Sequence, residues 1–266
     1  MSPVAHKPTS LIRVINLDAS VDRRQAFKQM AGGTKLDWAF FPAYIGKTEP
    51  LQYDDRVAVR RWGRPLSPAE IGCYTSHFKL WEWLLNSDCD QAIIFEDDVI
   101  AEWSLIEKLA ITRFSDYGIN LLRLQVPYPF HCRVVKYRLF SPNNHVVRIV
   151  GNIPGAAAYL LTKPAARILV ANYSTVAAPL DWILARYWEH RIVGYCIFPF
   201  PVIERDGPST IGDERHAVSH SAVSDRIARI GWRIRDRAER AYADHCLIKK
   251  CPLGPTKDSG PPLIRA

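Results

Sequence analysis

A short apolar run that ends in three consecutive carboxylates constrains this chain more than any other segment. Ala92-Ile93-Ile94-Phe95 suits a buried strand, and Glu96-Asp97-Asp98 follows it directly. Like charges this close repel and each resists burial, so a positive group should compensate them. In open α/β sheets ligands bind beyond the carboxyl ends of strands, where a divalent cation bridging to a diphosphate would compensate these charges. A solvated turn after the strand is the simpler alternative.

The pattern of strands and helices predicts an α/β domain. A β-branched strand over Leu11 to Leu17 precedes a helical stretch through Met30, which is a βα start. Ser67, Pro68 and Glu70 form a helix start with a capping box, and that helix should run to about Leu85. Further strands are expected at 38–45, 120–126, 146–150, 156–161 and 192–198, helices at 162–171 and 179–190, and irregular chain at 47–65.

Composition and charge divide the chain into two unequal parts. An apolar content of 48% over 266 residues fits a substantial packed core. We expect residues 1–215 to form the α/β domain and residues 216–266 to form a basic helical extension with a flexible tail. The formal net charge of +8 implies an anionic partner, which could be nucleic acid, an acidic membrane surface or a phosphate-bearing substrate. Much of the excess lies between Ala222 and Lys250.

That basic segment is predicted to form an amphipathic helix that rests on anionic lipid. Its apolar residues interleave with arginines, as expected of an interfacial helix, and they are Ile227, Ile230, Trp232, Ile234 and Tyr242. A helix packed on the domain with a solvated basic face is the alternative.

The cysteines and the apolar runs bear on the compartment. The six cysteines show no Cys-x-x-Cys pair, so reduced thiols in a cytosolic protein are expected. The N-terminal residues lack an apolar stretch of signal-peptide length, and no apolar run approaches the roughly twenty residues that span a bilayer. We therefore expect a cytoplasmic protein, peripheral on the inner face of the cell membrane if the basic helix binds lipid.

Three stretches in order resemble glycosyltransferase family 25, the bacterial lipopolysaccharide and lipooligosaccharide transferases related to collagen galactosyltransferases. They are Val14 to Leu17 with Asp22-Arg23-Arg24, Leu66 to His77, and Ile93 to Val99, with weaker agreement up to about Ile211. The resemblance implies a GT-A type fold, with a Rossmann-like mixed sheet flanked by helices. It also implies an inverting transfer of galactose or glucose from a UDP-sugar to a lipopolysaccharide or other surface glycan, with Mn²⁺ or Mg²⁺ as cofactor.

The resemblance further implies roles for individual residues. Asp98 would hold the metal and Glu96 would face the donor; strand alternation places these two on one side and Asp97 on the other. An arginine fork suits phosphate, although an ordinary basic helix face also explains the two arginines of the first motif. The expected donor-binding residues are Asn16, Arg23, Arg24, Ser76, His77, Glu96 and Asp97, and the expected acceptor-binding residues are Gly155 and Ser209.

Two of the candidate residues have a structural alternative. His77 could hydrogen-bond substrate or support the acidic cluster, or it could be a core histidine satisfied by a backbone carbonyl. An inverting transfer needs a general base, and Asp181 is the candidate. Its place at the start of a predicted helix suits an N-cap equally well.

Two other functions fit part of the sequence. A basic nucleic-acid-binding protein would explain the charge, but no recognised nucleic-acid motif supports it, and we expect no nucleic-acid partner. Another metal-dependent nucleotide enzyme could use the same carboxylates, but the sequence lacks a glycine-rich phosphate loop and a His-Asp metal signature. A glycosyltransferase is therefore the preferred hypothesis.

Overall fold

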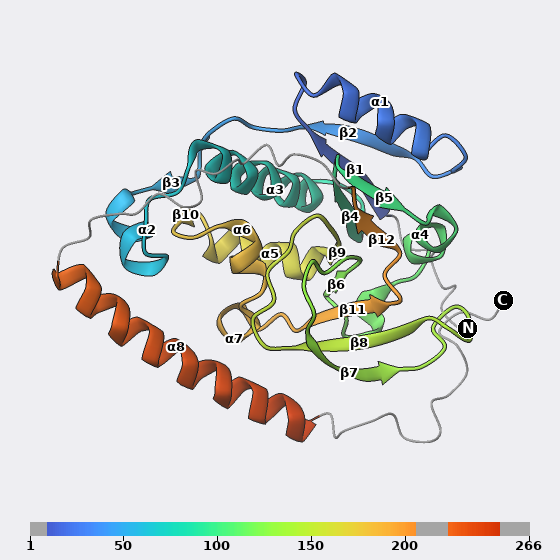
Figure 1. The fold of residues 1–266 in the computed structure, drawn as a ribbon. Coiled ribbons are helices and arrows are strands. Elements are labelled where there is room, and N and C mark those ends of the chain that lie inside the picture. Colours follow the sequence, from blue (N-terminus) through green and yellow to red (C-terminus); the bar gives the residue numbers. More distant parts are fainter. Residues whose placement is uncertain (1–9, 206–222, 251–266) are drawn as a thin grey trace.

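The computed structural model describes residues 10–205 and 223–250, and an eight-stranded mixed sheet lies at its centre (Figure 1). The strand order is β2-β1-β4-β9-β6-β11-β8-β7. β1 is parallel to β2 and β4, β9 is antiparallel to β4 and β6, and β11 is parallel to β6. The strands are β1 (Ser10–Asn16), β2 (Trp38–Pro42), β4 (Gln91–Glu96), β6 (Leu121–Arg123), β7 (His131–Lys136), β8 (His145–Val150), β9 (Ala158–Thr162) and β11 (Gly194–Phe198).

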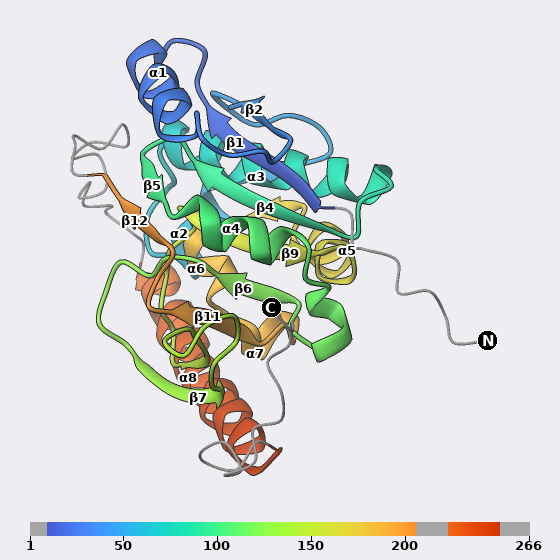
Figure 2. The same ribbon diagram turned by 90° about the vertical axis from the view of Figure 1, so that its right-hand side faces the viewer.

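Helices cover both faces of the sheet (Figures 1 and 2). α1 (Val21–Met30) and α4 (Trp103–Ala110) pack on one face, while α3 (Pro68–Asn86), α5 (Lys163–Asn172) and α6 (Leu180–Leu184) pack on the other. β4 shows how one strand serves both layers, because successive side chains point to opposite faces. Ala92 and Ile94 join the α3 core, and Ile93 and Phe95 join the α1–α4 core. The predicted α/β class, with a mixed sheet flanked by helices, is confirmed.

The predicted helix start before α3 is present. The Ser67 hydroxyl accepts from the Glu70 backbone N–H at 3.2 Å, and the Ser67 N–H donates to the Glu70 carboxylate at 2.9 Å. These two bonds satisfy backbone donors that the helix end would leave unpaired. Of the predicted apolar stripe, Tyr74, Phe78 and Trp81 are fully buried, whereas Ile71 and Leu85 are partly buried against the same core.

Two local predictions are wrong. The stretch 47–65, expected to be irregular, contains β3 (Gln52–Tyr53) and α2 (Asp55–Arg61), and the Asp54 side chain caps α2 by accepting from the Arg56 N–H at 2.7 Å. The single helix expected over 179–190 is broken into α6 and α7 (Tyr187–His190). It breaks because the backbone of Arg186 leaves the helical region at φ −92° and ψ 55°, with its side chain buried in tertiary contacts.

Two small sheets and one long helix complete the described chain. β10 (Thr175–Val176) pairs with β3, and β12 (Val202–Glu204) pairs with β5 (Val99–Ala101). A 3₁₀ turn spans Phe114–Tyr117. The helix expected at 222–250 is α8 (Val223–Lys250), which packs against α2 and α7. The expected boundary near residue 215 and the expected tail lie outside the described residues.

Candidate active site at the end of β4

The carboxylate triplet spans the end of β4 and the turn that leads into β5. β4 ends at Glu96, and Asp97 and Asp98 form the turn into β5. Pairing of β5 with β12 fixes this turn, because the Arg205 backbone N–H donates to the Asp98 carbonyl at 2.6 Å. Strand geometry stops at Glu96, so the alternation predicted to place Glu96 with Asp98 does not hold. Asp97 and Asp98 instead share one partner.

That partner is Arg23, at the start of α1. Its guanidinium lies 3.0 Å from Asp97 Oδ1 and 3.1 Å from Asp98 Oδ2. Asn16, at the end of β1, donates to Asp97 Oδ2 at 2.6 Å. We call Asn16, Arg23, Asp97 and Asp98 the strand-end cluster. Because β1 and β4 are parallel neighbours, their carboxyl ends meet, and this brings four residues from the two predicted motifs together.

Arg24 supports this cluster from behind. Its Nε donates to Asn16 Oδ1 at 2.7 Å, and its terminal nitrogen pairs with Asp18 at 2.7 Å. These bonds fix which face of the Asn16 amide meets Asp97. Asn16 and Asp97 are both buried, so the structure places them as holders of the turn, with Arg23 and Asp98 nearer the surface.

Asp98 carries an oxygen that the described protein leaves unsatisfied. Oδ2 pairs with Arg23, whereas Oδ1 is buried and has no hydrogen-bond partner among the described residues. Burial, and then the nearby Glu96 charge, raise the pKa of the Asp98 carboxyl above its usual value. A buried carboxylate oxygen without a donor is costly, and a hard divalent cation prefers such a ligand. Asp98 therefore fits the metal-holding role expected of it.

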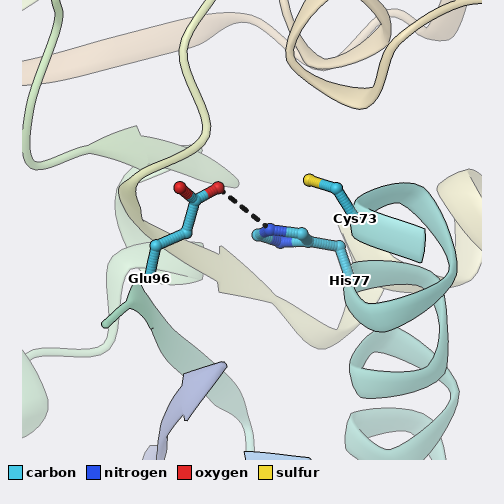
Figure 3. Close-up of side chains that lie close together, drawn as sticks. All are labelled: Cys73, His77 and Glu96. Carbon is cyan, nitrogen blue, oxygen red and sulfur yellow. Dashed lines mark ion pairs between the residues drawn. The ribbon is translucent and has the colours of Figure 1, made fainter. Parts of the chain in front are cut away.

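Glu96 points to the other side of the strand end, toward α3. Figure 3 shows the Glu96 carboxylate facing the His77 ring. Glu96 Oε1 lies 3.5 Å from His77 Nε2, and His77 Nδ1 lies 2.8 Å from the Tyr159 hydroxyl. Trp81 Nε1 donates to the same hydroxyl at 2.9 Å. The His77 ring is fully buried and stacks on Tyr159. His77 thus lies between Glu96 and Tyr159. Its hydrogen-bond partner is the Tyr159 side chain, whereas the structural alternative was a backbone carbonyl.

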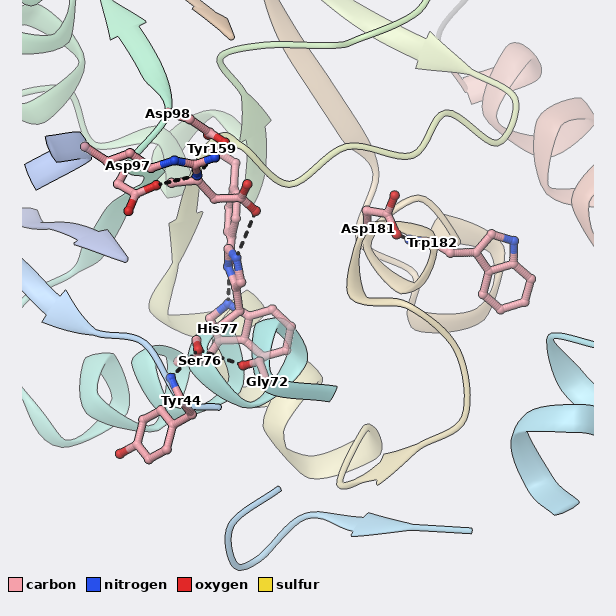
Figure 4. Close-up of polar contacts among 12 residues, drawn as sticks. Tyr44, Gly72, Ser76, His77, Asp97, Asp98, Tyr159, Asp181 and Trp182 are labelled. Atoms are coloured by element: carbon pink, nitrogen blue, oxygen red, sulfur yellow. Dashed lines mark hydrogen bonds and ion pairs between the residues drawn. The ribbon is translucent and has the colours of Figure 1, made fainter. Parts of the chain in front are cut away.

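Ser76 does not reach a ligand surface. Its hydroxyl accepts from the Tyr44 N–H at 2.8 Å and donates to the Gly72 carbonyl at 2.7 Å. Both contacts are drawn in Figure 4. A Cβ at position 72 would collide with the Tyr44 carbonyl, so glycine permits the chain after β2 to approach α3 this closely. The Ser76 side chain is buried and its hydroxyl is used internally, so it positions the chain after β2, and its donor contact stays a prediction.

Asp181 lies on a separate element, the first turn of α6 (Figure 4). The N-cap position belongs to Pro179, and Asp181 Oδ1 accepts from the Trp182 N–H at 2.8 Å, so Asp181 is not the cap of this helix. The buried Arg123 guanidinium attracts the Asp181 carboxylate. Burial lowers the pKa of Arg123 to about 10, and it remains charged near neutrality.

Of the two predicted acceptor-binding residues, Gly155 lies among the described residues and Ser209 does not. Gly155 has φ +139°, and a Cβ there would lie 2.9 Å from Pro127 Cδ, so this loop requires glycine. Arg123 braces the same loop by donating to the Ile153 carbonyl at 2.7 Å. Ser209 lies outside the described residues.

Three supporting residues escaped the sequence reasoning: Trp81, Arg123 and Tyr159. Trp81 was recognised only as core, and Tyr159 lies 82 positions from the histidine that it contacts. The available signal was an arginine inside a largely apolar predicted strand, since buried charge needs a partner.

Comparison with known families shows which family the chain belongs to. The family described as Glycosyltransferase family 25 (LPS biosynthesis protein) matches residues 10–184. The chain belongs to glycosyltransferase family 25. The match includes the strand-end cluster, His77, Glu96 and Asp181, and it confirms the resemblance seen in the sequence.

Relatives of this family 25 chain differ in how much they share with it. The lipooligosaccharide biosynthesis protein lic2B of Haemophilus influenzae is 23% identical over 62% of this chain and 64% of its own length. Procollagen galactosyltransferase 1-A of Xenopus laevis is 28% identical over 32% of this chain and 15% of its own length. The chain thus spans less than two thirds of the length of each of these two relatives.

The solved structures resemble the chain only distantly. A crystal structure of the galactosyltransferase LgtC with donor and acceptor sugar analogs has a TM-score of 0.36 and 14% identity, covering 84% of this chain and 96% of that one. At this level the likeness carries no argument about the site, which rests on the family match and the geometry.

Proposed function

We propose that this chain is an inverting glycosyltransferase that moves a hexose, galactose or glucose, from a UDP-sugar to a lipopolysaccharide or other surface glycan. The observation that carries the proposal is the unsatisfied Asp98 Oδ1, buried beside Arg23 within the strand-end motif that family 25 matches. The carboxylate and the guanidinium together offer one ligand for a cation and one fork of donors for a diphosphate.

Asp98 would hold the cofactor, Mn²⁺ or Mg²⁺, through that oxygen. Bound there, the cation would neutralise charge that develops on the leaving diphosphate. Arg23 is 26% exposed at its side chain and bridges two carboxylates, so it can share its donors with an incoming phosphate without leaving the cluster. Asn16, Arg24 and Asp97 keep Arg23 and Asp98 in place.

Asp181 is the proposed general base. In an inverting transfer the acceptor hydroxyl oxygen attacks the anomeric carbon, the bond from that carbon to the diphosphate oxygen breaks, and the hydroxyl proton moves to the base. The Trp182 N–H donates to Asp181 Oδ1, and this bond orients the carboxylate that would take the proton. The Gly155 loop and Ser209 are proposed to meet the acceptor, and Glu96 to meet the donor with His77 behind it.

A membrane surface is the proposed meeting place with a lipid-linked acceptor, and this would put the chain on the cytoplasmic face. α8 docks with one face: Trp232 packs on Trp182, and Ala243 is buried. The opposite face exposes Ile230, Ile234 and Tyr242 by 56%, 63% and 68%. Arg233, Arg235 and Arg237 flank these side chains and are exposed, which supports attraction to anionic lipid.

Two features of α8 modify the sequence expectation. Trp232 belongs to the docked face, whereas it was expected among the lipid-facing residues, and Ile227 lies in a part of α8 whose side chains are not described. Within the described chain, none of the helices is long and apolar enough to cross a bilayer.

The test of the proposed function is calorimetric titration with UDP-galactose and UDP-glucose, in Mn²⁺ and in EDTA. We expect binding in Mn²⁺ and at least tenfold weaker binding in EDTA, because the diphosphate and the carboxylates repel each other without a cation. Asp98→Asn should behave in Mn²⁺ as the unmodified protein does in EDTA. Undiminished binding after chelation would remove the metal from the proposal, and absence of binding by any nucleotide sugar would refute the transferase function.

A further inference from the structure

A second group of potential metal ligands lies where α3 faces the end of β4. Cys73, His77 and Glu96 each offer one ligand atom, and these three atoms lie within 4.8 Å of one another. Cys73 and His77 stand four residues apart on α3, so helical geometry stacks them on one face. Figure 3 shows both side chains directed toward the Glu96 carboxylate.

His77 Nε2 is the observation that points to a ligand here. The ring is fully buried, and Nε2 has no hydrogen-bond partner within the described part of the chain. The 3.5 Å that separates it from Glu96 Oε1 is long for a hydrogen bond. Two ligands at about 2.0–2.1 Å from one tetrahedral zinc ion lie about 3.4 Å apart, so this separation suits a shared metal. His77 Nε2 and Glu96 Oε1 are therefore separated as two ligands of one tetrahedral ion would be.

The donor set distinguishes this group from Asp98. A thiolate, an imidazole and a carboxylate are borderline-soft to hard ligands typical of zinc, whereas Asp98 offers oxygen alone, which suits Mn²⁺ or Mg²⁺. Three protein ligands leave a fourth tetrahedral position for water or a substrate oxygen. Cys73 is not in a disulfide, and it would bind as the thiolate after its proton passes to solvent.

Tyr159 contacts the other nitrogen of the His77 ring. A metal on Nε2 requires the imidazole proton on Nδ1, where the Tyr159 hydroxyl oxygen lies 2.8 Å away and can accept it. That oxygen already accepts from Trp81 Nε1, which fixes its position. A hydroxyl oxygen has two lone pairs, so both donors can be served at once.

We propose that Cys73, His77 and Glu96 form a zinc-class site with an open fourth position, separate from the Asp98 site. The site stands on its own ligands and does not depend on sugar transfer, so it survives if the proposed donor binding fails.

The test uses Co²⁺ as a spectroscopic probe on the full chain, stripped of metal and kept reduced. We expect one tightly bound Co²⁺ with a thiolate-to-metal charge-transfer band and the intense visible bands of tetrahedral cobalt, and we expect Zn²⁺ to displace it. Cys73→Ser should abolish the charge-transfer band, and Glu96→Gln should weaken Co²⁺ binding. Cys132→Ser, at an exposed cysteine on β7, is the matched control and should change nothing.

Two further variants separate this site from its surroundings. Asp98→Asn should retain the charge-transfer band, which would show that the thiolate-bound ion is not the one proposed at Asp98. Tyr159→Phe should lower Co²⁺ affinity about 10- to 100-fold, the usual cost of losing the partner of a metal-bound imidazole. Circular dichroism establishes that each variant is folded. No charge-transfer band in the unmodified protein, or a band that persists in Cys73→Ser, would overturn the proposal.

Discussion

The strand-end cluster and the surroundings of Arg186 both bury charge, but they enclose it differently. Asp98 and Arg23 are 32% and 26% exposed at their side chains. Arg186 is 1% exposed, and three tryptophan rings surround its guanidinium. A partly open cluster can exchange one partner for a ligand, whereas a closed one can only hold the fold together.

The contacts of Arg186 explain why the second cluster is closed. Its guanidinium carbon lies 3.9 Å from the ring centre of Trp182 and 4.7 Å from those of Trp188 and Trp232. One nitrogen pairs with Glu189 and with Asp236 of α8. We call these six residues the arginine cage. It joins α6, which carries Asp181, to α7 and α8, so the position of the proposed base depends on these packing contacts.

The largest expected effect is a loss of turnover on substitution of Asp181, and it tests whether Asp181 is the general base. Asp181→Asn should lower kcat by about a hundredfold to ten-thousandfold, the usual contribution of a general base, with donor and Mn²⁺ affinity nearly unchanged. Asp98→Asn should instead weaken both affinities. Steady-state kinetics and calorimetry separate the two outcomes. Near-normal turnover in Asp181→Asn would exclude it as the base.

Replacing Arg23 and Arg186 in turn compares how much each cluster contributes to the free energy of unfolding. Arg186→Met should destabilise the fold by about 3–5 kcal/mol, because it leaves Asp236 without its buried partner. Arg23→Met should cost less, about 1–3 kcal/mol, since Asp98 is partly solvated and Asp97 keeps the hydrogen bond from Asn16. Urea denaturation measures both, and Mn²⁺ should restore stability only to Arg23→Met. Equal losses, or equal rescue by Mn²⁺, would contradict the contrast between an open and a closed cluster.

The sequence predicted the open cluster better than the closed one, for a physical reason. Asn16 and Asp98 follow from motifs at the ends of β1 and β4, which parallel pairing brings together, and Arg23 lies in the first turn of α1 directly after β1. Arg186 is 50 positions from Asp236, and nothing local to either residue indicates the contact. The predicted continuous helix over 179–190 failed at this residue, because burial of its side chain overrides local helix propensity.

The same distinction applies to the carboxylate triplet. Its position at a strand end was predicted, but the direction of each side chain was not. Strand alternation fails because β5 and β12 turn the chain at Asp98, and that pairing is set by residues more than a hundred positions downstream. The buried contact of His77 with Tyr159 likewise arises from packing of α3 on β9 and could not be read from either segment alone.

A smaller effect is expected at Gly155, where the backbone rather than a side chain is constrained. Gly155→Ala should cost about 1–3 kcal/mol, since φ +139° strains an L-residue and the new Cβ meets Pro127. Gly118→Ala is the control: its φ is +69°, and no atom within 4 Å meets an added Cβ. If the loop meets the acceptor, only Gly155→Ala should raise KM for the acceptor. If both variants change KM for the acceptor equally, Gly155 serves only to form a turn.

The smallest expected effect concerns the outer face of α8, which the arginine cage should keep in place. The double variant Ile230→Ser, Ile234→Ser removes exposed apolar side chains that lie opposite Trp232, so stability should stay within about 0.5 kcal/mol of the unmodified protein. Binding to liposomes with anionic lipid should fall about tenfold, and binding of the unmodified protein should weaken as salt rises. Ile168→Ser, at an exposed isoleucine of α5, is the matched control and should bind as the unmodified protein does. If the double variant co-sediments with these liposomes as well as the control does, α8 serves only to close the cage, and its basic face is simply solvated.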